Sequence, residues 1–244
     1  MQKTLCTLAL TLCLGCASSA FAQSAATFNE TLTAAQQGNA EAQDKVGLMY
    51  QKGQGVAKDE AKAAEWFHKA ADQGNNNAAN SLGGMYLMGN GVGQDEVQAA
   101  EWFRKAAEQG NVDAQYNLGV MYEGGQGIKA DNAIAAAWYR RAADQGDAAS
   151  QNNLGSMYRD GLGVAQNDEQ AAEWFRKAAE QGYSYAEVNL GLMYKTGRGV
   201  EQSKAKAIEW FRKAAAQGIM VAEVELRELE NNQGGSVKPA KYSK

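Results

Sequence analysis

The sequence repeats itself every 36 residues, and this recurrence restricts the chain to a fold made of stacked copies of one small unit. The five tryptophans mark the period: Trp66, Trp102, Trp138, Trp174 and Trp210. A glycine and a tyrosine follow the same period, with no insertion or deletion between copies: Gly38, Gly74, Gly110, Gly146, Gly182 and Gly218, and Tyr50, Tyr86, Tyr122, Tyr158 and Tyr194. A unit of this length buries little core alone, so consecutive units are expected to stack.

Each repeat contains two helical patterns, and the third copy shows the first pattern clearly. Over residues 112–123, Ala114, Leu118, Met121 and Tyr122 fall at i, i+4, i+7 and i+8, which predicts one apolar helix face. Composition also favours helices broken by glycine over sheets, because Ala, Gln, Glu and Lys dominate and proline occurs once in 244 residues.

Glycine recurs at two places in each repeat where we expect a structural reason. Gly119 lies inside a predicted helix, where glycine costs about 1 kcal/mol against alanine. Its recurrence predicts a close backbone approach between helices. The helix is followed by a G-x-G-[VI] motif, first at Gly53 and Gly55. The first glycine suits a left-handed residue that closes a helix, and the pair permits a tight turn. A nucleotide-binding interpretation is weak, because no strand precedes the motif and it occurs five times.

The second helix of each repeat is predicted to start after a residue that suits an N-cap: Asp59, Asp95, Asp131, Asn167 and Ser203. It carries the pattern A-x-x-W-[FY]-[HR]-[KR]-A-A-x-Q-G, in which the aromatic pair and the alanines form the packing face. Pairs such as Glu101 and Lys105 fall at i and i+4 in the favourable orientation, and we interpret these charges as a solvated face.

Half-repeats flank the array and are expected to cap it. Five repeats occupy residues 39–218, a capping helix is predicted over 23–38, and another over 219–230. Residues 231–244 are polar and lack periodicity, so a mobile tail is expected there. The predicted fold class is therefore all-α, a solenoid of five 36-residue helical hairpins with half-repeat caps.

The first 22 residues have the pattern of a signal peptide. Lys3 precedes an apolar run over residues 5–14, and residues 20–22 read A-F-A, so the mature chain is expected to start at Gln23. The alternative is a lipoprotein modified at Cys16, which follows a glycine. The apolar run is too short to span a bilayer, so no integral membrane segment is expected after cleavage.

Cysteine usage and charge exclude several classes of function. All three cysteines, Cys6, Cys13 and Cys16, lie in the leader, so the mature chain is expected to lack thiols and disulfides. A C-x-x-C redox or metal interpretation of Cys13 and Cys16 is weaker than a chance pairing in the apolar run. The chain has 24 basic and 28 acidic residues, a net charge of −4, which is no electrostatic footprint for nucleic acid.

The unit A-x-x-x-L-G-x-M-Y-x-x-G-x-G-V-x-x-D…A-x-x-W-F-x-K-A-A-x-x-G resembles the Sel-one-like repeat (SLR) family, relatives of tetratricopeptide repeats, over about residues 39–218. The resemblance implies antiparallel helix pairs stacked into a right-handed superhelix, and a role as adaptor or scaffold. Exported bacterial members include envelope regulators, assembly scaffolds and host-interaction factors. A cysteine-rich branch, associated with β-lactam binding or hydrolysis, has a disulfide in each repeat. The repeats of this chain contain no cysteine, so that activity is not carried over.

Two short motifs match those of penicillin-recognising enzymes, but their order argues against catalysis. Ser203 to Lys206 fits S-x-x-K and Lys195 to Gly197 fits K-T-G, yet S-x-x-K follows K-T-G here and S-D-N is absent. His68, the single histidine, stands where other repeats have arginine and is expected on an exposed helix face. With no second histidine and no mature cysteine, we predict no metal site, no cofactor and no catalytic residue.

A partner is expected to bind along the first helices, which the family resemblance places on the concave side of the solenoid. The predicted contact residues lie on the first helices of the third to fifth repeats: Tyr116, Asn117, Val120, Asn153, Tyr185, Val188, Asn189 and Leu192. Exposed apolar clusters often mark interaction sites, tyrosine is a common anchor, and asparagine pairs with peptide backbone. Two alternatives stay open: Tyr185 and Val188 pack on the C-terminal cap, and the asparagines bind neighbouring loops.

The predicted function is a protein–protein interaction adaptor or scaffold of the bacterial envelope, periplasmic or secreted, with a protein or peptide partner. One alternative is a secreted factor that engages host molecules. A less favoured one is an envelope enzyme acting on β-lactams or cell-wall material. The chain is predicted to be no enzyme, because its acidic residues are assigned to helix caps and exposed faces and no catalytic dyad emerges.

Overall fold

The structure, a computed structural model, describes residues 23–231, and within this range every regular element is helical. The predicted signal peptide at 1–22, with the candidate lipid site Cys16, lies outside the described residues, as do 232–244 of the predicted tail. A helix over residues 23–36 comes first. The bounds of the helices that follow are α2 Ala40–Lys52, α3 Glu60–Ala71, α4 Asn76–Met88, α5 Glu96–Glu108, α6 Val112–Gly124, α7 Asn132–Asp144, α8 Ala148–Asp160, α9 Asp168–Glu180, α10 Ser184–Thr196, α11 Lys204–Ala216 and α12 Met220–Asn231.

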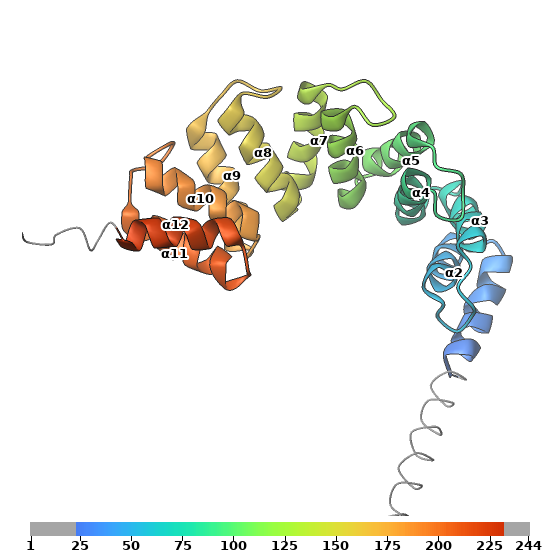
Figure 1. Ribbon diagram of the computed structural model, residues 1–244. Coiled ribbons are helices and arrows are strands. Elements are labelled where there is room, and N and C mark those ends of the chain that lie inside the picture. Colours follow the sequence, from blue (N-terminus) through green and yellow to red (C-terminus); the bar gives the residue numbers. More distant parts are fainter. Residues whose placement is uncertain (1–22, 232–244) are drawn as a thin grey trace, which may run out of the picture. The chain divides into compact units, whose positions relative to one another are not determined.

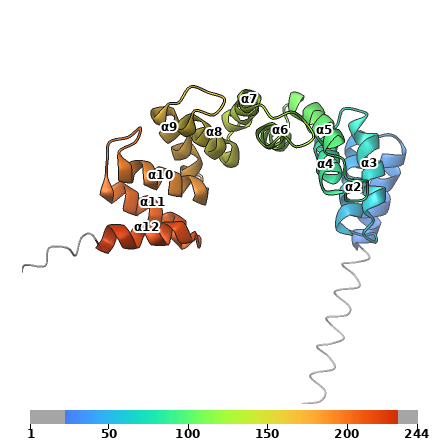
Figure 2. The same cartoon turned by 45° about the horizontal axis from the view of Figure 1, so that its top comes forward.

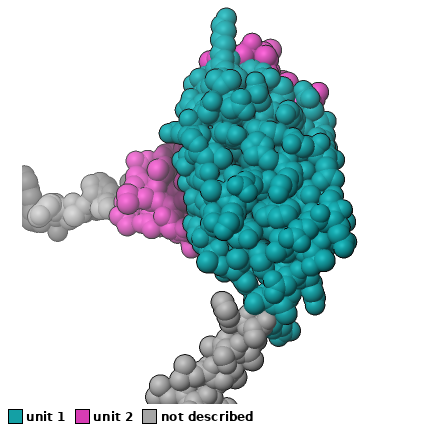
Figure 3. Space-filling model, turned by 90° about the vertical axis from the view of Figure 1, so that its right-hand side faces the viewer, with its two compact units in different colours: residues 1–129 teal, residues 130–244 magenta. Residues whose placement is uncertain are grey.

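The chain divides into two compact units, which Figure 3 colours separately. Unit 1 ends at Lys129 and unit 2 begins at Ala130. Within each unit, every helix packs against the next one along the chain, from α2 to α6 and from α7 to α12. Figures 1 and 2 show these helices as consecutive hairpins laid side by side. The prediction of an all-α array of 36-residue hairpins is thereby confirmed.

The G-x-G motif shapes the loop inside each hairpin as predicted. Gly89 ends α4 in the left-handed region, at φ 72° and ψ 27°, and its N–H donates to the carbonyl oxygen of Met85. Gly91 also has a φ of +72°, and a Cβ there would collide with the backbone of Glu60, at the start of α3. Two features thus require glycine at the second position: its backbone is left-handed, and the loop lies directly on the preceding second helix.

Polar side chains cap both kinds of helix. The predicted caps of the second helices are confirmed: Asp95 Oδ1 accepts hydrogen bonds from the backbone N–H groups of Val97 and Gln98, at 2.9 and 3.0 Å. The sequence reasoning overlooked a matching row of caps at the first helices, formed by Asn39, Asn75, Asn111 and Asp147. Tyr183 interrupts this row, because it provides no side-chain cap for α10.

The recurrent glycine of the first helices faces an aromatic ring at Gly47, Gly83, Gly155 and Gly191. A Cβ on Gly83 would lie 2.6 Å from the Phe103 ring, and one on Gly191 would lie 2.6 Å from the Phe211 ring. The close approach is therefore confirmed, but its partner is a phenylalanine side chain of the same hairpin and not a helix backbone. Both rings are fully buried, so the missing Cβ creates the space in which the core aromatic residue packs.

The basic residues near the end of the second helices do more than face solvent. Lys105 Nζ lies 3.8 Å from the centre of the Trp102 ring, and Arg141 Cζ lies 4.5 Å from that of Trp138. A cation in this position is attracted by the electron-rich face of the ring. The interpretation of these charges as a solvated face is therefore incomplete, since the cations also pack on the rings of the repeated tryptophans.

The position of His68 also differs from the prediction. The imidazole is half-buried, with Nε2 3.2 Å from the hydroxyl oxygen of Tyr86 and the ring packed edge-on against Trp102. Arg104 occupies the same position in the next repeat and donates from Nη2 to the Tyr122 hydroxyl at 3.2 Å. The side chain at this position therefore links a second helix to the next first helix. This contact explains why His68 is half-buried and not exposed as predicted.

Candidate protein-binding surface on the first helices

In unit 1, three predicted contact residues lie on α6 and all are half-buried: Tyr116, Asn117 and Val120. Asn117 Nδ2 donates to Asn80 Oδ1, on α4, at 3.3 Å. This amide is therefore already engaged with the neighbouring first helix. The side chains lie between first helices at the surface, where they both stabilise the stack and present part of their area to solvent.

In unit 2, the five predicted residues divide by exposure: Asn153, Tyr185, Val188, Asn189 and Leu192. Tyr185 is 60 % exposed, whereas Val188 is 8 % exposed and belongs to the core of this unit. The prediction of Val188 as a surface contact is thus corrected. The equivalent Asn80 and Asn152 form hydrogen bonds with the next first helix. Val188 belongs to the same core cluster as Ala222 and Leu229 of α12. Asn153, Asn189 and Leu192 are half-buried.

The asparagines form links between neighbouring first helices. Asn189 Nδ2 donates to Asn152 Oδ1 on α8 at 2.9 Å, and Asn189 Oδ1 accepts from Arg159 Nη1 at 3.2 Å. Both ends of the Asn189 amide are therefore used within the protein. The alternative in which these asparagines serve the scaffold has direct support in these contacts, although their partners are helices and not loops.

A hollow of about 310 Å³ lies on unit 2 beside these contacts, between α8, α10 and the loop after α10. Its lining includes two predicted contact residues, Asn189 and Leu192, together with Met193, Thr196, Arg159 and Arg198. The floor is apolar and the edge carries two guanidinium groups. This mixture suits a segment of polypeptide that presents an apolar side chain near a carboxylate or a carbonyl group.

Ion pairs hold both arginines in place. Arg159 donates to Asp160 through Nε and Nη2, each at 2.8 Å, and this hydrogen bonding raises the pKa of Arg159 and lowers that of Asp160. Arg198 donates from Nε to Asp168 Oδ2 and from Nη2 to the carbonyl oxygen of Arg159, both at 2.9 Å. The guanidinium groups are thus oriented before any partner binds.

Sequence reasoning missed Arg159, Arg198 and Thr196. For Arg159 a signal existed, because it lies seven residues after Asn152 and so falls on the same helix face. Arg198 stands between the two glycines of a G-x-G motif, which marks a turn and says nothing of where its side chain reaches. Its contact is with a residue 39 positions earlier in the chain.

The C-terminal helix adds an exposed apolar strip to unit 2. Met220, Val221 and Val224 are 76 %, 56 % and 48 % exposed on α12. The centre of the Tyr185 ring, on α10, lies 5.9 Å from that of Tyr183, with the two rings tilted by 52°. The position of Val224 is buried or half-buried in every preceding repeat, whereas the position of Val221 is also exposed at Tyr185. Exposed apolar side chains that lie close together often mark interaction sites, so this strip is a candidate to contribute to binding.

The residues of the penicillin-recognising motifs have structural partners. Ser203 Oγ caps α11 by accepting from Lys206 N at 3.3 Å, as the sequence indicated. Lys195 Nζ forms ion pairs with Glu225 and with Glu228. Within residues 23–231, no group of three or more His, Cys, Asp or Glu side chains is arranged to hold a metal ion. No helix in the same range is long and apolar enough to span a membrane.

Paired helices of 12 or 13 residues, stacked with a 36-residue period and joined by left-handed glycines, define a helical repeat protein. Five segments match the family model of the Sel1 repeat: residues 40–75, 76–111, 112–147, 148–183 and 184–219. The chain therefore belongs to the Sel1 repeat family. Proteins of this family are generally protein–protein interaction scaffolds and are typically not enzymes.

Solved structures agree with this assignment. The chain is similar to c5321 of uropathogenic Escherichia coli, which has an SLR fold, at 40 % identity and a TM-score of 0.81 over 86 % of this chain and 45 % of that one. It thus spans less than half the length of c5321. A Sel1 repeat protein from Oxalobacter formigenes is 32 % identical, with a TM-score of 0.73, over 83 % of this chain and 86 % of that one. No curated protein matches the chain.

Proposed function

We propose that this protein is an adaptor or scaffold of the bacterial envelope that binds a protein or peptide along its first helices. The observation that carries the proposal is the match of residues 40–219 to five consecutive Sel1 repeats, a family of interaction modules. The hollow on unit 2 supplies a location, because it joins an apolar floor at Leu192 to the anchored guanidinium groups of Arg159 and Arg198.

Tyr185 is the residue that we expect to anchor the partner. Its ring is 60 % exposed on α10, the helix that also carries Leu192. Tyrosine offers a large apolar area at low entropic cost together with a hydroxyl group, which explains its enrichment at binding hot spots. Removal of such an anchor typically costs 2 kcal/mol or more, which is about a thirtyfold loss of affinity.

Affinity capture tests the proposal. The full chain, tagged at its C-terminus and purified as the cell produces it, is incubated with an envelope extract, and retained proteins are identified by mass spectrometry. Variants Tyr185→Ser and Leu192→Ser, and Tyr116→Ser on unit 1, are compared with Glu173→Ser, which alters the exposed face of a second helix. We expect a specific partner that the Glu173 variant retains and the Tyr185 variant loses. Equal retention by all folded variants would refute the proposed surface.

An envelope location is part of the proposal and is supported by the sequence of residues 1–22. Cell fractionation tests it, with the periplasmic fraction as the expected location. Mass measurement of the exported chain distinguishes cleavage before Gln23 from a lipid-modified Cys16. An uncleaved chain in the cytosolic fraction would contradict export.

One observation favours a second candidate, a secreted factor that engages host molecules. The Escherichia coli protein c5321, similar over 86 % of this chain, is described as a protective antigen. A host-facing role requires the chain outside the cell, so its release into the growth medium is the expected result. Retention in the periplasm would favour the adaptor.

A further inference from the structure

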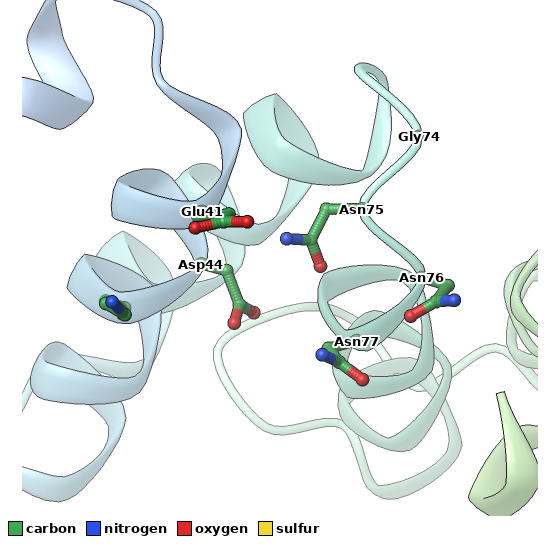
Figure 4. Close-up of a pocket in the computed structure, with 7 residues that line it drawn as sticks. Glu41, Asp44, Gly74, Asn75, Asn76 and Asn77 are labelled. Atoms are coloured by element: carbon green, nitrogen blue, oxygen red, sulfur yellow. The ribbon is translucent and has the colours of Figure 1, made fainter.

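Unit 1 contains a polar hollow of about 380 Å³ where α2 meets the start of α4 (Figure 4). Two carboxylates, Glu41 and Asp44, lie on the α2 side, and Asn75 and Asn77 lie on the α4 side. All four positions belong to first helices or their caps, the elements to which the proposed function assigns binding. The hollow is separate from the one on unit 2 and shares no residue with it.

Asp44 is the unusual residue of this hollow. Its side chain is only 9 % exposed, and Oδ1 is buried without a hydrogen-bond partner. Burial raises the pKa of Asp44, with a smaller opposing effect from the nearby Lys45. Lys45 lines the hollow too, but its ammonium group forms no ion pair with Asp44 in the described part of the chain. A buried carboxylate with an unsatisfied oxygen is costly, so such groups normally have a partner.

Two other repeats show what is missing here. At the position equivalent to Asp44, Asn80 and Asn152 each accept a hydrogen bond from an asparagine of the next first helix, at 3.3 and 2.9 Å. The donors are Asn117 and Asn189. In the first pair of repeats, Ser81 replaces that asparagine and is shorter. Tyr116 and Val188 occupy this position in the third and fifth repeats, so Asp44 is the charged member of the five and is matched with a serine where Asn80 and Asn152 are matched with an asparagine.

The opposite wall of the hollow presents donors. Asn75 Oδ1 accepts from Ala78 N at 2.9 Å, and Asn77 Oδ1 accepts from Asn111 Nδ2 at 2.9 Å. Because both oxygens are used in this way, the NH₂ groups of the two asparagines are turned toward Glu41 and Asp44, as Figure 4 shows. A ligand that fits must therefore donate strongly on one side and accept on the other.

Charge supports a cationic ligand. A second hollow of about 380 Å³ adjoins the first, shares Glu41 and Lys45 with it, and adds Glu30. Three carboxylates therefore face one ammonium group across the two hollows. An arginine residue of a polypeptide meets every requirement: its planar guanidinium donates in pairs to a carboxylate, and its backbone carbonyl accepts from an amide NH₂ group.

We infer that this hollow is a subsite for an arginine residue of the bound polypeptide, whose guanidinium supplies Asp44 with the donor that Ser81 is too short to provide. The inference rests on the proposed function, since it names part of what the partner presents. Asp44 recognises the charge, Glu41 adds a second carboxylate, and Asn75 and Asn77 donate to the peptide backbone.

NMR titration of the full chain tests the subsite. The probe is the peptide acetyl-Ala-Arg-Ala-amide, compared with acetyl-Ala-Gln-Ala-amide, and the readout is the side-chain NH₂ signals of Asn75 and Asn77. We expect saturable shifts with the arginine peptide and none with the glutamine peptide. No shift with the arginine peptide would refute the subsite. Spermidine, a cation without a peptide backbone, should bind at least about tenfold more weakly, or about 1.4 kcal/mol. Equal binding of spermidine would refute recognition of a polypeptide.

Two variants separate binding from folding. Asp44→Asn keeps the shape of the side chain without its charge, and Ser81→Asn introduces the donor that the other repeats have. We expect both variants to unfold at a higher temperature than the wild type and to bind the arginine peptide at least about tenfold more weakly. Unchanged peptide binding in Asp44→Asn would overturn the inference, as would tighter binding in Ser81→Asn. If the arginine peptide does not bind while affinity capture still retains a partner that depends on Tyr185, the arginine subsite is refuted and the proposed function is not.

Discussion

Glu187 occupies a buried position that glutamine holds in three other repeats, as Gln43, Gln115 and Gln151. Each of these glutamines donates from Nε2 to a backbone carbonyl eight residues earlier, at 3.1 Å. A carboxylate has no proton for this bond. Glu187 only accepts, from Gln217 Nε2 at 2.9 Å, and burial raises its pKa.

Replacement of Glu187 by glutamine should therefore stabilise the protein at pH 7, by about 1 kcal/mol, the typical value of one hydrogen bond. The pH dependence has a defined sign. Because the folded-state pKa of Glu187 is raised, its favourable contribution is present below the ordinary glutamate pKa and is lost as the pH rises through the folded value. Glu187→Gln should remove this loss.

Urea unfolding between pH 4 and pH 8 measures the effect. The reciprocal change Gln151→Glu, at the equivalent position of the same unit, is the matched control and should destabilise the protein at pH 7 while restoring a loss of stability with rising pH. A Glu187→Gln protein that is less stable than the wild type at pH 7 would show that the carboxylate has a stabilising role.

At the scale of the helix, α4 contains two adjacent glycines with different surroundings. A Cβ on Gly83 would lie 2.6 Å from the Phe103 ring, whereas a Cβ on Gly84 would meet nothing within 4 Å. Both residues have helical backbone angles, so alanine gains the same helix propensity at either position, about 1 kcal/mol. The difference between them is the packing of the hairpin.

We expect Gly83→Ala to destabilise unit 1, since overpacking typically costs about 1–3 kcal/mol and exceeds the gain in propensity. Gly84→Ala should raise stability by up to about 1 kcal/mol. Thermal unfolding of the two variants provides the comparison. Equal stability of both proteins would mean that the Phe103 ring moves aside without cost.

Helix α5 allows a test of the caps. Asp95 satisfies two backbone N–H groups at its start. Asp95→Ala should cost about 1 kcal/mol in unfolding free energy, while Asp95→Asn, which keeps an acceptor oxygen, should cost a few tenths at most. Denaturant unfolding of both variants checks the order. If Asp95→Asn proved as unstable as Asp95→Ala, the charge at the helix end would be the main term and not the hydrogen bonds.

At the scale of the whole molecule, each unit is a row of helices in which every member contacts its neighbours along the chain. Stability in such a row is a sum of repeat terms and nearest-neighbour interfaces. Helix α12 packs against α11 and exposes Met220, Val221 and Val224, whereas α9 is covered by both α8 and α10.

Native-state hydrogen exchange should therefore show a gradient within unit 2. Amides of α9 should exchange slowly, close to the rate set by global unfolding, and those of α12 should exchange faster by opening of the last helix alone. Mass spectrometry of peptides from the two helices measures this difference. Uniform protection across α9 and α12 would instead indicate that unit 2 unfolds as one cooperative body, with its exposed strip covered in solution.

The amino-acid sequence by itself determined the period, the two helices of each repeat, the caps at Asp59 and its equivalents, and the left-handed glycines. These features depend on residues within a few positions of one another, so local propensity and spacing are sufficient. Membership of the Sel1 repeat family follows from the same features.

Only the tertiary structure decided which surface residues are open. Val188 is buried in a core cluster that also contains Ala222 and Leu229 of α12, while Tyr185, three residues earlier, is exposed. Arg198 joins the hollow on unit 2 through a bond to a residue 39 positions away, and Asp44 Oδ1 is buried without a hydrogen-bond partner. Each of these outcomes depends on the side chain that a neighbouring repeat places opposite, and spacing along a single helix does not contain that information.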